Sequence, residues 1–167
     1  MAFDSERLFD ETGRRILQEL QRNARITFSE LGRRVSLTPP AVADRVRRLE
    51  EAGVIRGYRA EVDPAALGLP VVAFIRITAT GELCTALARV IHEFPEVLEC
   101  HRVTGEEAFI AKVVLRSVTH LERLIDRLMP YGETITSIVL SSPVTHRVIE
   151  PARDEPAPEE PEASRAV

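Results

Sequence analysis

The side chains with the clearest chemical potential lie in residues 38–59. Five arginines fall in this stretch: Arg45, Arg47, Arg48, Arg56 and Arg59. A guanidinium presents a planar set of donors that fits phosphate oxygens or the edge of a guanine base. Val42, Val46 and Leu49 recur at the spacing of one helical stripe, so the helix that carries them buries one side. A short helix with arginines on its other side is what recognition of a DNA major groove requires.

The ends of this helix are marked by capping residues. Thr38 is a suitable N-cap, Pro39 suits the first helical position, and Gly53 suits the left-handed residue after the last turn. We therefore predict a helix over 39–52. The predicted DNA-contacting residues are those in or beside it that lie off the apolar stripe: Thr38, Pro40, Ala41, Asp44, Arg45, Arg47, Arg48 and Arg56. The alternative is that these arginines form an ordinary solvated face.

Within this set the residues have different expected roles. Arg47 and Arg48 are predicted to contact the groove or a phosphate, whereas Arg45 lies nearer the buried stripe and is predicted to anchor to a phosphate. Asp44 has two options, since a carboxylate accepts from the amino group of cytosine and also pairs with an arginine one turn on.

Two further helices and a small wing precede and follow this element. Asp10 is the predicted cap of a helix over 11–22, whose inward residues are Ile16, Leu17 and Leu20. Thr27 and Glu30 form a capping box that opens a second helix over 28–35, with Phe28, Leu31 and Val35 inward. Short strands at 54–55 and 58–62 complete a winged helix-turn-helix over residues 1–62.

The rest of the chain has a different pattern. A linker at 63–70 leads to strands and helices in the order βαββαβ over 71–150: strands at 71–79, 97–104, 108–116 and 134–142, and helices at 82–94 and 118–130. The predicted fold class is α+β, a winged helix-turn-helix followed by a ferredoxin-like sandwich. The helix at 82–94 has five apolar residues: Leu83, Leu87, Val90, Ile91 and Phe94. We expect Phe74, Val113 and Ile138 on the open sheet face, where another subunit would cover them.

Charge is distributed unevenly along the chain. Residues 1–60 hold 12 arginines against nine acidic residues, whereas residues 61–150 hold eight basic residues against 12 acidic ones. A basic first part joined to an acidic second part favours contact with nucleic acid despite the net charge of −4. The tail at 151–167 is acidic and rich in proline, which predicts disorder.

Other function classes find little support. The sequence has no long apolar run and no signal-peptide pattern, so we expect a cytoplasmic protein without membrane contact. Cys84 and Cys100 are expected to be buried thiols, and His92, His101, His120 and His146 lack the spacing of metal ligands. No Gly-rich phosphate loop or catalytic triad is visible, which weighs against an enzyme, and no cofactor is expected.

Several segments, at matching separations, resemble the Lrp/AsnC family of transcription regulators. They are FDETGRRIL at 9–17, LEEAGVIRGY at 49–58, LGL at 67–69, ECHRVTG at 99–105 and TITSIVL at 134–140. The resemblance covers about residues 8–150. It implies a regulator of double-stranded DNA that forms homodimers through the sandwich sheets, often assembled into octamers. It also implies a small effector, commonly an amino acid, bound in clefts between dimers.

The implied effector site lies around the second hairpin and the last strand. Its candidate residues are Gly105, Glu106, Glu107, Ala108, Phe109, Thr134, Thr136 and Ser137. The sequence departs from the family pattern at three positions. Gly13 replaces a usual aspartate at an expected small cost in helix stability, Asp44 stands where a basic residue is common, and Ala108 replaces an aspartate that helps to hold the ammonium of amino-acid ligands.

Two rival interpretations follow from these features. Ala108 favours an architectural DNA-binding protein of the same fold that responds to no effector. Some relatives with this two-domain layout decarboxylate a tetrapyrrole, and they would use histidines and basic residues of the cleft rather than the recognition helix. The arginines around the helix at 39–52 make the enzyme the poorer interpretation, whereas a regulator with an effector and a DNA-binding protein without one stay open.

Overall fold

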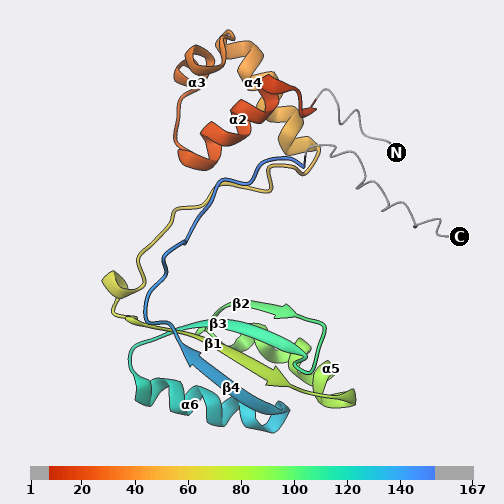
Figure 1. The fold of residues 1–167 in the computed structure, drawn as a ribbon, viewed down its shortest axis with the longest axis vertical. Coiled ribbons are helices and arrows are strands. Elements are labelled where there is room, and N and C mark those ends of the chain that lie inside the picture. Colours follow the sequence, from red (N-terminus) through yellow and green to blue (C-terminus); the bar gives the residue numbers. More distant parts are fainter. Residues whose placement is uncertain (1–7, 153–167) are drawn as a thin grey trace, which may run out of the picture. The chain divides into compact units, whose positions relative to one another are not determined.

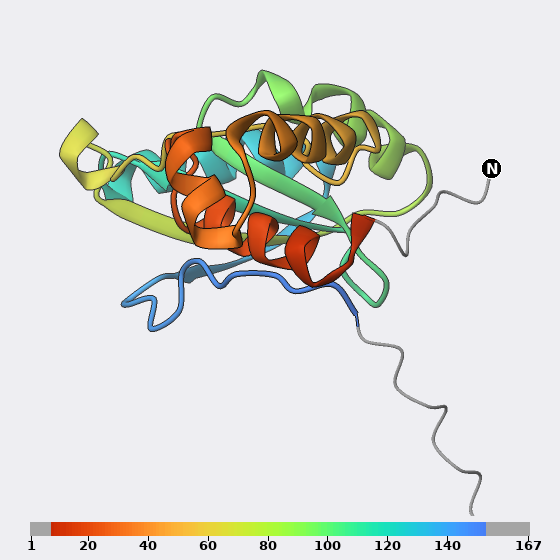
Figure 2. The ribbon, with the colours of Figure 1, turned by 90° about the horizontal axis from the view of Figure 1, so that it is seen from above.

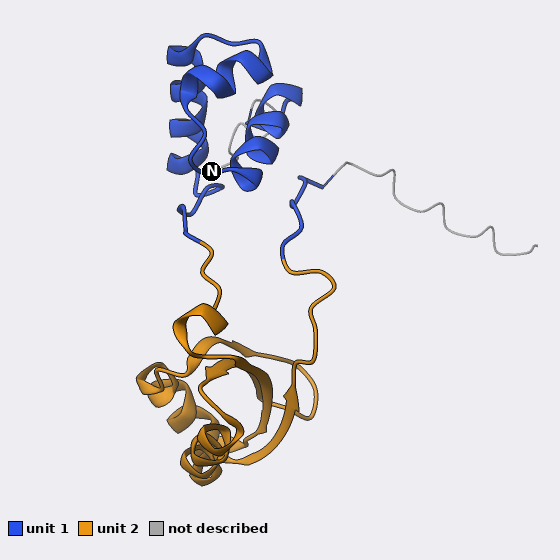
Figure 3. Cartoon of the chain, turned by 90° about the vertical axis from the view of Figure 1, so that its left-hand side faces the viewer, with its two compact units in different colours: residues 1–60, 146–167 blue, residues 61–145 orange. Residues whose placement is uncertain are grey.

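A computed structural model describes residues 8–152 of the chain. It contains two compact units, one made of residues 1–60 with 146–167 and the other of residues 61–145 (Figure 3). The second unit ends at residue 145, five residues before the end of the predicted sandwich domain. The predicted disorder of the tail concerns residues that, from 153 on, lie outside the described ones. Over residues 8–152, no helix is long and apolar enough to cross a membrane.

Within the described residues, the first unit is built on helices α2 (Glu11–Arg22), α3 (Phe28–Val35) and α4 (Pro39–Glu51), coloured red to gold in Figures 1 and 2. They lie as predicted to within one residue. Their apolar stripes form one buried cluster of Ile16, Leu17, Leu20, Leu31, Val35, Val42, Val46 and Leu49. The turn between α3 and α4 places Ser36 in the left-handed region (φ 59°). This turn brings the Leu37 carbonyl oxygen so close to Gly32 that a Cβ there would lie 2.5 Å from it.

Two local predictions for this unit, the burial of Phe28 and the wing strands, were wrong, and the predicted cap of α4 is only partly realised. Phe28 is 43% exposed and lies outside the cluster. Thr38 occupies the N-cap of α4, but its side chain makes no capping hydrogen bond. A cap normally accepts from the second or third helical N–H, and Pro40 at the second position has none.

The predicted wing strands at 54–55 and 58–62 are also absent. Residues 54–62 run without regular secondary structure after α4. A two-stranded ribbon is at best marginally stable without a partner to pack on. The ends of this segment are exposed, with Val54 37% and Val62 55% exposed.

The second unit is a four-stranded antiparallel sheet with helices, as predicted. Its elements are β1 (Val71–Thr78), α5 (Gly81–Val90), β2 (Val97–Arg102), β3 (Phe109–Leu115), α6 (Val118–Leu128) and β4 (Glu133–Ile138), with short 3₁₀ turns at Ala65–Leu67, Ile91–Glu93 and Met129–Tyr131. The strand order is β2-β3-β1-β4 (Figure 1). The two longest-range pairings, β1 with β3 and β1 with β4, place β1 at the centre of the sheet.

The sheet has a helix-facing side and an open side. The core toward the helices includes Ala73, Ile75, Ile77, Phe109, Ala111, Leu87 and Leu124. Val113 on β3 is fully buried there and pairs with Ala73, and Ile138 on β4 pairs with Ala73 from the other side. Both residues therefore belong to the helix-facing side, and their predicted place on the open face was wrong. A single residue of error in strand phase moves a side chain to the opposite face.

Not every apolar residue of α5 is buried. Leu83 is 45% exposed, because α5 directs Cys84 and Leu87 inward. Phe74 does lie on the open face, beside its cross-strand partners Lys112 and Ser137, and is 41% exposed.

A buried carboxylate holds α6 to the rest of the second unit. Glu96, 7% exposed, accepts hydrogen bonds from His120 Nε2 at 3.0 Å and from Arg127 Nη1 at 2.9 Å. Burial raises the pKa of this carboxyl. Hydrogen bonds from its own backbone N–H and from His120, with the charge of Arg127, together lower the pKa by more than burial raises it, so the pKa is below its usual value. The charge is therefore retained at neutral pH.

Candidate nucleic-acid interface

Helix α4 has one buried side and one outward side. Val42, Val46 and Leu49 are at most 2% exposed. Because successive helical residues are about 100° apart, the residues opposite this stripe are Pro40, Asp44, Arg47, Arg48 and Glu51. The outward face therefore carries two arginines and two carboxylates, and it is the surface of the helix that is free to enter a groove.

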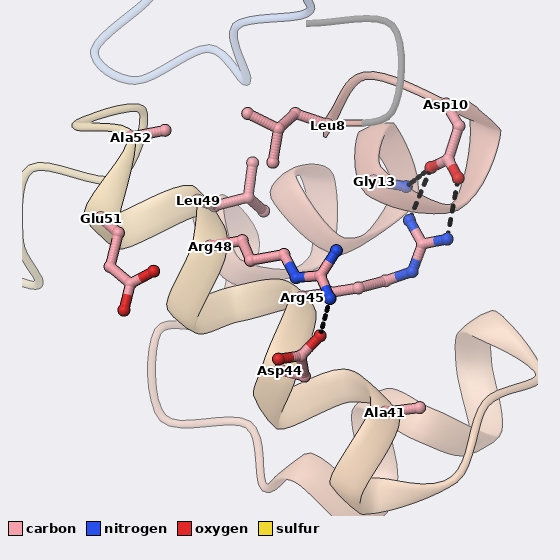
Figure 4. A pocket seen from close by; sticks show the side chains of 10 residues that line it. All are labelled: Leu8, Asp10, Gly13, Ala41, Asp44, Arg45, Arg48, Leu49, Glu51 and Ala52. Atoms are coloured by element: carbon pink, nitrogen blue, oxygen red, sulfur yellow. Dashed lines mark hydrogen bonds and ion pairs between the residues drawn. The ribbon is translucent and has the colours of Figure 1, made fainter. Parts of the chain in front are cut away.

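Arg45 lies at the edge of the buried stripe and has a partner inside the unit. Its Nη1 and Nη2 atoms contact Oδ1 and Oδ2 of Asp10, each at 2.8 Å (Figure 4). This forked pair joins the start of α2 to the middle of α4. Asp10 also caps α2 by accepting from the Gly13 N–H at 2.7 Å. The hydrogen bond from Arg45 is the main cause that holds the pKa of Asp10 below its ordinary value.

Gly13 is required by this arrangement rather than being a weak point of α2. A Cβ at this position would lie 2.0 Å from the Leu8 carbonyl oxygen and 3.2 Å from Asp10 Oδ1. The chain before α2 thus packs directly on the helix backbone. The expected stability cost of Gly13 took only helix propensity into account and missed this close approach.

Asp44 binds both outward arginines at once. Its Oδ1 lies 2.6 Å from Arg47 Nη2, and its Oδ2 lies 2.8 Å from Arg48 Nη2. Arg47 makes a second ion pair through Nη1 with Glu51 Oε1 at 2.7 Å. The hydrogen bond from Arg47 is the largest cause of the lowered pKa of Asp44, and the same bond raises the pKa of Arg47. The intrahelical alternative for Asp44 is therefore present in the free protein.

The remaining predicted contact residues lie around the two ends of α4. Thr38 and Pro40 are exposed and Ala41 is half-buried, all at its first turn. Beyond its last turn, Arg56 is exposed and forms no ion pair with any residue of 8–152. Tyr58 anchors the segment that carries Arg56 by donating to Glu50 Oε1 at 2.8 Å; its burial, with this bond, raises its pKa to about 12.

A cavity of about 580 Å³ adjoins the inner edge of the outward face. Its walls include Asp10, Arg45, Asp44 and Arg48, together with apolar Leu8 and Leu49 (Figure 4). The Arg45–Asp10 and Arg48–Asp44 ion pairs thus border the same cavity.

The predicted effector residues do not share one environment. Phe109, 4% exposed, belongs to the core and pairs with Ile77. Ala108 donates its backbone N–H to the Ile77 carbonyl oxygen at 2.9 Å, and Glu107 pairs with Arg76 Nη1 at 3.3 Å. The hairpin that includes Gly105 and Glu106 is therefore fastened to β1.

The β4 candidates divide between the two sides of the sheet. Thr134 and Thr136 pair with Ile77 and Ile75 and face the helices, whereas Ser137 pairs with Phe74 and lies on the open side. Since β1 separates β3 from β4, the hairpin and β4 are two strand spacings apart, about 10 Å. Of Thr134, Thr136 and Ser137, only Ser137 lies on the open side of the sheet, which it shares with Phe74 and Arg76 of β1.

Residues 8–152 contain no group of three His, Cys, Asp or Glu side chains that could hold a metal ion. Cys84 is buried as expected and Cys100 is half-buried, and burial raises the pKa of the Cys100 thiol.

Comparison with known proteins places both units in one family. Residues 9–56 match the winged helix-turn-helix DNA-binding family and residues 72–149 match the Lrp/AsnC ligand binding domain. The HTH-type transcriptional regulator YezC of Bacillus subtilis is 43% identical over 82% of this chain and 97% of its own length. The chain belongs to the Lrp/AsnC family of transcription regulators. The predicted family and fold class are confirmed.

Solved structures of Lrp/AsnC proteins have the same fold. LrpC of B. subtilis has a TM-score of 0.78 at 33% identity, covering 82% of this chain and 98% of LrpC. The feast or famine regulatory protein of Mycobacterium tuberculosis, solved in complex with L-methionine, has a TM-score of 0.78 at 36% identity, covering 86% of this chain and 99% of that protein.

Two carboxylates of the interface were not among the predicted site residues. Glu51 stands four residues after Arg47, a spacing that is visible in the sequence and that favours an ion pair. Asp10 and Arg45 are 35 positions apart, and no pattern within one sequence connects them.

The two roles of Asp10 can be separated by substitution. Asp10→Asn should keep the cap of α2, since asparagine caps as well as aspartate, and should lose only the partly exposed ion pair, worth less than about 1 kcal/mol. Asp10→Ala should cost about 1 kcal/mol more because the cap is lost as well. Hydrogen exchange of the α2 backbone amides measures both values, and equal losses in the two variants would contradict the double role.

The stability difference between the wild-type protein and Asp10→Asn should depend on pH. The pKa of Asp10 is lowered in the folded state, so its contribution is complete above the unfolded value of about 3.9 and is lost as the pH falls below it. The difference between the wild-type protein and Asp10→Asn should therefore shrink on acidification.

Proposed function

We propose that this chain regulates transcription by binding double-stranded DNA through α4, as a dimer or a larger homo-oligomer. The single observation that supports α4 as the recognition helix is its outward face, which presents Arg47 and Arg48 opposite a fully buried stripe. In a dimer, two such helices enter successive major grooves on one side of a pseudo-palindromic site. The chain acts by binding, in the compartment that holds the DNA, and not by catalysis.

Replacing both arginines should weaken DNA binding specifically. Arg47→Ala with Arg48→Ala should lower affinity for the chain's own promoter region by about tenfold or more. Mobility-shift titrations measure this loss of affinity.

A matched control keeps the net charge change the same. Arg89 and Arg123 are exposed residues of α5 and α6, so replacing these two with alanine removes two positive charges away from α4. If both double variants bind DNA equally well, α4 is not the recognition helix.

We further propose that the open face of the sheet joins two subunits. This face exposes Phe74 and Ile135, 41% and 54% exposed, on neighbouring strands. Apolar side chains gathered on one sheet face are typical of an interaction surface. The dimer can then pair sheet to sheet, and further contacts would extend it to an octamer.

A charge placed on this face should separate the subunits. Phe74→Glu should convert the oligomer to monomers at micromolar concentration, since it replaces an apolar ring of the interface with a carboxylate, whose removal from water is costly even beside Lys112. Leu83→Glu is the matched control, because Leu83 is 45% exposed on α5, and it should leave the molar mass unchanged. Light scattering after gel filtration decides, and an unchanged mass of the Phe74→Glu variant would exclude this interface.

A small effector, an L-amino acid of the methionine class, is proposed to bind near the hairpin at 105–108. The M. tuberculosis relative in complex with L-methionine supports this proposal. Ala108 works against it by withholding a carboxylate, and it favours the alternative of a DNA-binding protein without an effector. Backbone N–H groups around Gly105 can still hold the carboxylate of a ligand.

The effector proposal predicts a ligand-dependent melting temperature. L-Methionine at about 100 times its Kd should stabilise the protein by about 2.7 kcal/mol. Ala108→Asp should increase that shift, because it restores a partner for the ammonium. If no L-amino acid shifts the melting of either protein, the effector-independent alternative stands.

A further inference from the structure

The outward face of α4 is electrically balanced, which is unusual for a helix that meets a polyanion. Arg47 and Arg48 are opposed by Asp44 and Glu51 on the same face, and three ion pairs connect the four side chains. Long-range attraction to phosphates is carried by uncompensated positive charge. The balanced face therefore contributes little to sequence-independent binding, unlike the segment after α4, where Arg56 and Arg59 form no ion pair with residues 8–152.

Asp44 is the centre of this arrangement. One carboxylate holds two guanidiniums, one on each oxygen, at 2.6 Å and 2.8 Å. The two arginines are adjacent in sequence and project from neighbouring positions, so the shared carboxylate fixes the separation between their guanidiniums. Each guanidinium has five N–H groups, and the bonds to Asp44 and Glu51 leave others free to bind a further acceptor.

We propose that Asp44 is the specificity-determining residue of the DNA interface: it clamps Arg47 and Arg48 in one paired arrangement and withholds their charge from phosphates. This inference rests on the proposed function of α4 as the recognition helix. A base edge must be met in one orientation, so a clamped arginine loses less side-chain freedom on binding it. A phosphate accepts an arginine from many directions, so the clamp gives no such advantage there.

The carboxylate itself adds a second selective effect. Asp44, being charged, is repelled by phosphates and by the acceptor edges of guanine and thymine, whereas it accepts from the amino group of cytosine. Unfavourable contacts with wrong partners contribute to specificity as much as favourable contacts with the right one. The clamp thus lowers non-specific binding more than binding to a matching site.

The test compares matching and non-matching DNA. The full-length wild-type protein first selects its preferred duplexes from a random-sequence pool. The affinities of the wild-type, Asp44→Asn, Asp44→Glu and Glu51→Gln proteins are then measured on a selected duplex and on a shuffled duplex of the same composition, at several salt concentrations. Asp44 and Glu51 side chains are 41% and 61% exposed, so these variants are expected to fold.

The clamp predicts a distinct pattern among the variants. Asp44→Asn should bind the shuffled duplex about tenfold tighter, with a salt slope steeper by about one to two units, as the freed arginines reach phosphates. The ratio of selected to shuffled affinity should fall about tenfold. Asp44→Glu should largely restore the ratio. Glu51→Gln removes the same charge but leaves both Asp44 pairs intact, so it should change the ratio by less than about twofold.

Each other outcome overturns a defined statement. An unchanged ratio in Asp44→Asn, or equal weakening on both duplexes, overturns the clamp. An equal fall of the ratio in Glu51→Gln also overturns it, since net charge alone would then account for the effect. A wild-type protein that selects no DNA overturns the proposed function, and this outcome is recognised before any variant is tested.

Discussion

The burial of one apolar stripe on α4 determines the geometry of the whole DNA-binding unit. Val42, Val46 and Leu49 are almost completely buried, and each such side chain contributes about 1.5–3 kcal/mol by leaving water. No rotation of α4 about its axis can keep all three buried except the one observed. The residues that face outward are thereby fixed as well, and α2 and α3 serve to cover the stripe.

This constraint gives three neighbouring arginines different partners. Arg45 lies about 60° from the centre of the stripe and reaches Asp10 at the start of α2, so it stabilises the unit. Arg47 and Arg48 lie on the outward side and make their ion pairs with Asp44 and Glu51, carboxylates of α4 itself. Residue type alone would assign the same role to all three, whereas the helical angle gives Arg45 a partner on α2 and turns Arg47 and Arg48 outward.

The same distinction explains what could be predicted from the sequence. Helix positions followed from capping residues and apolar spacing because both are local, and α2, α3 and α4 begin at the predicted residues. The element order βαββαβ of the second unit was likewise predictable. Errors arose where the outcome depends on a neighbour: the phase of Val113 is set by its pairing with Ala73. The wing strands had suitable residues but nothing to pack on.

In the second unit, strand β1 connects the hairpin, where an effector is proposed to bind, with the open sheet face, where a second subunit is proposed to pack. The hairpin is bound to β1 through the Ala108 N–H and the Glu107–Arg76 pair, and the same strand presents Phe74 on the open face. A ligand changes an equilibrium only if it binds one state more tightly than the other. A molecule that competes with Glu107 for Arg76 would act two residues from Phe74, on the same side of the same strand. Ligand binding and subunit pairing would then depend on one row of side chains, so a coupling between them requires no change elsewhere in the sheet.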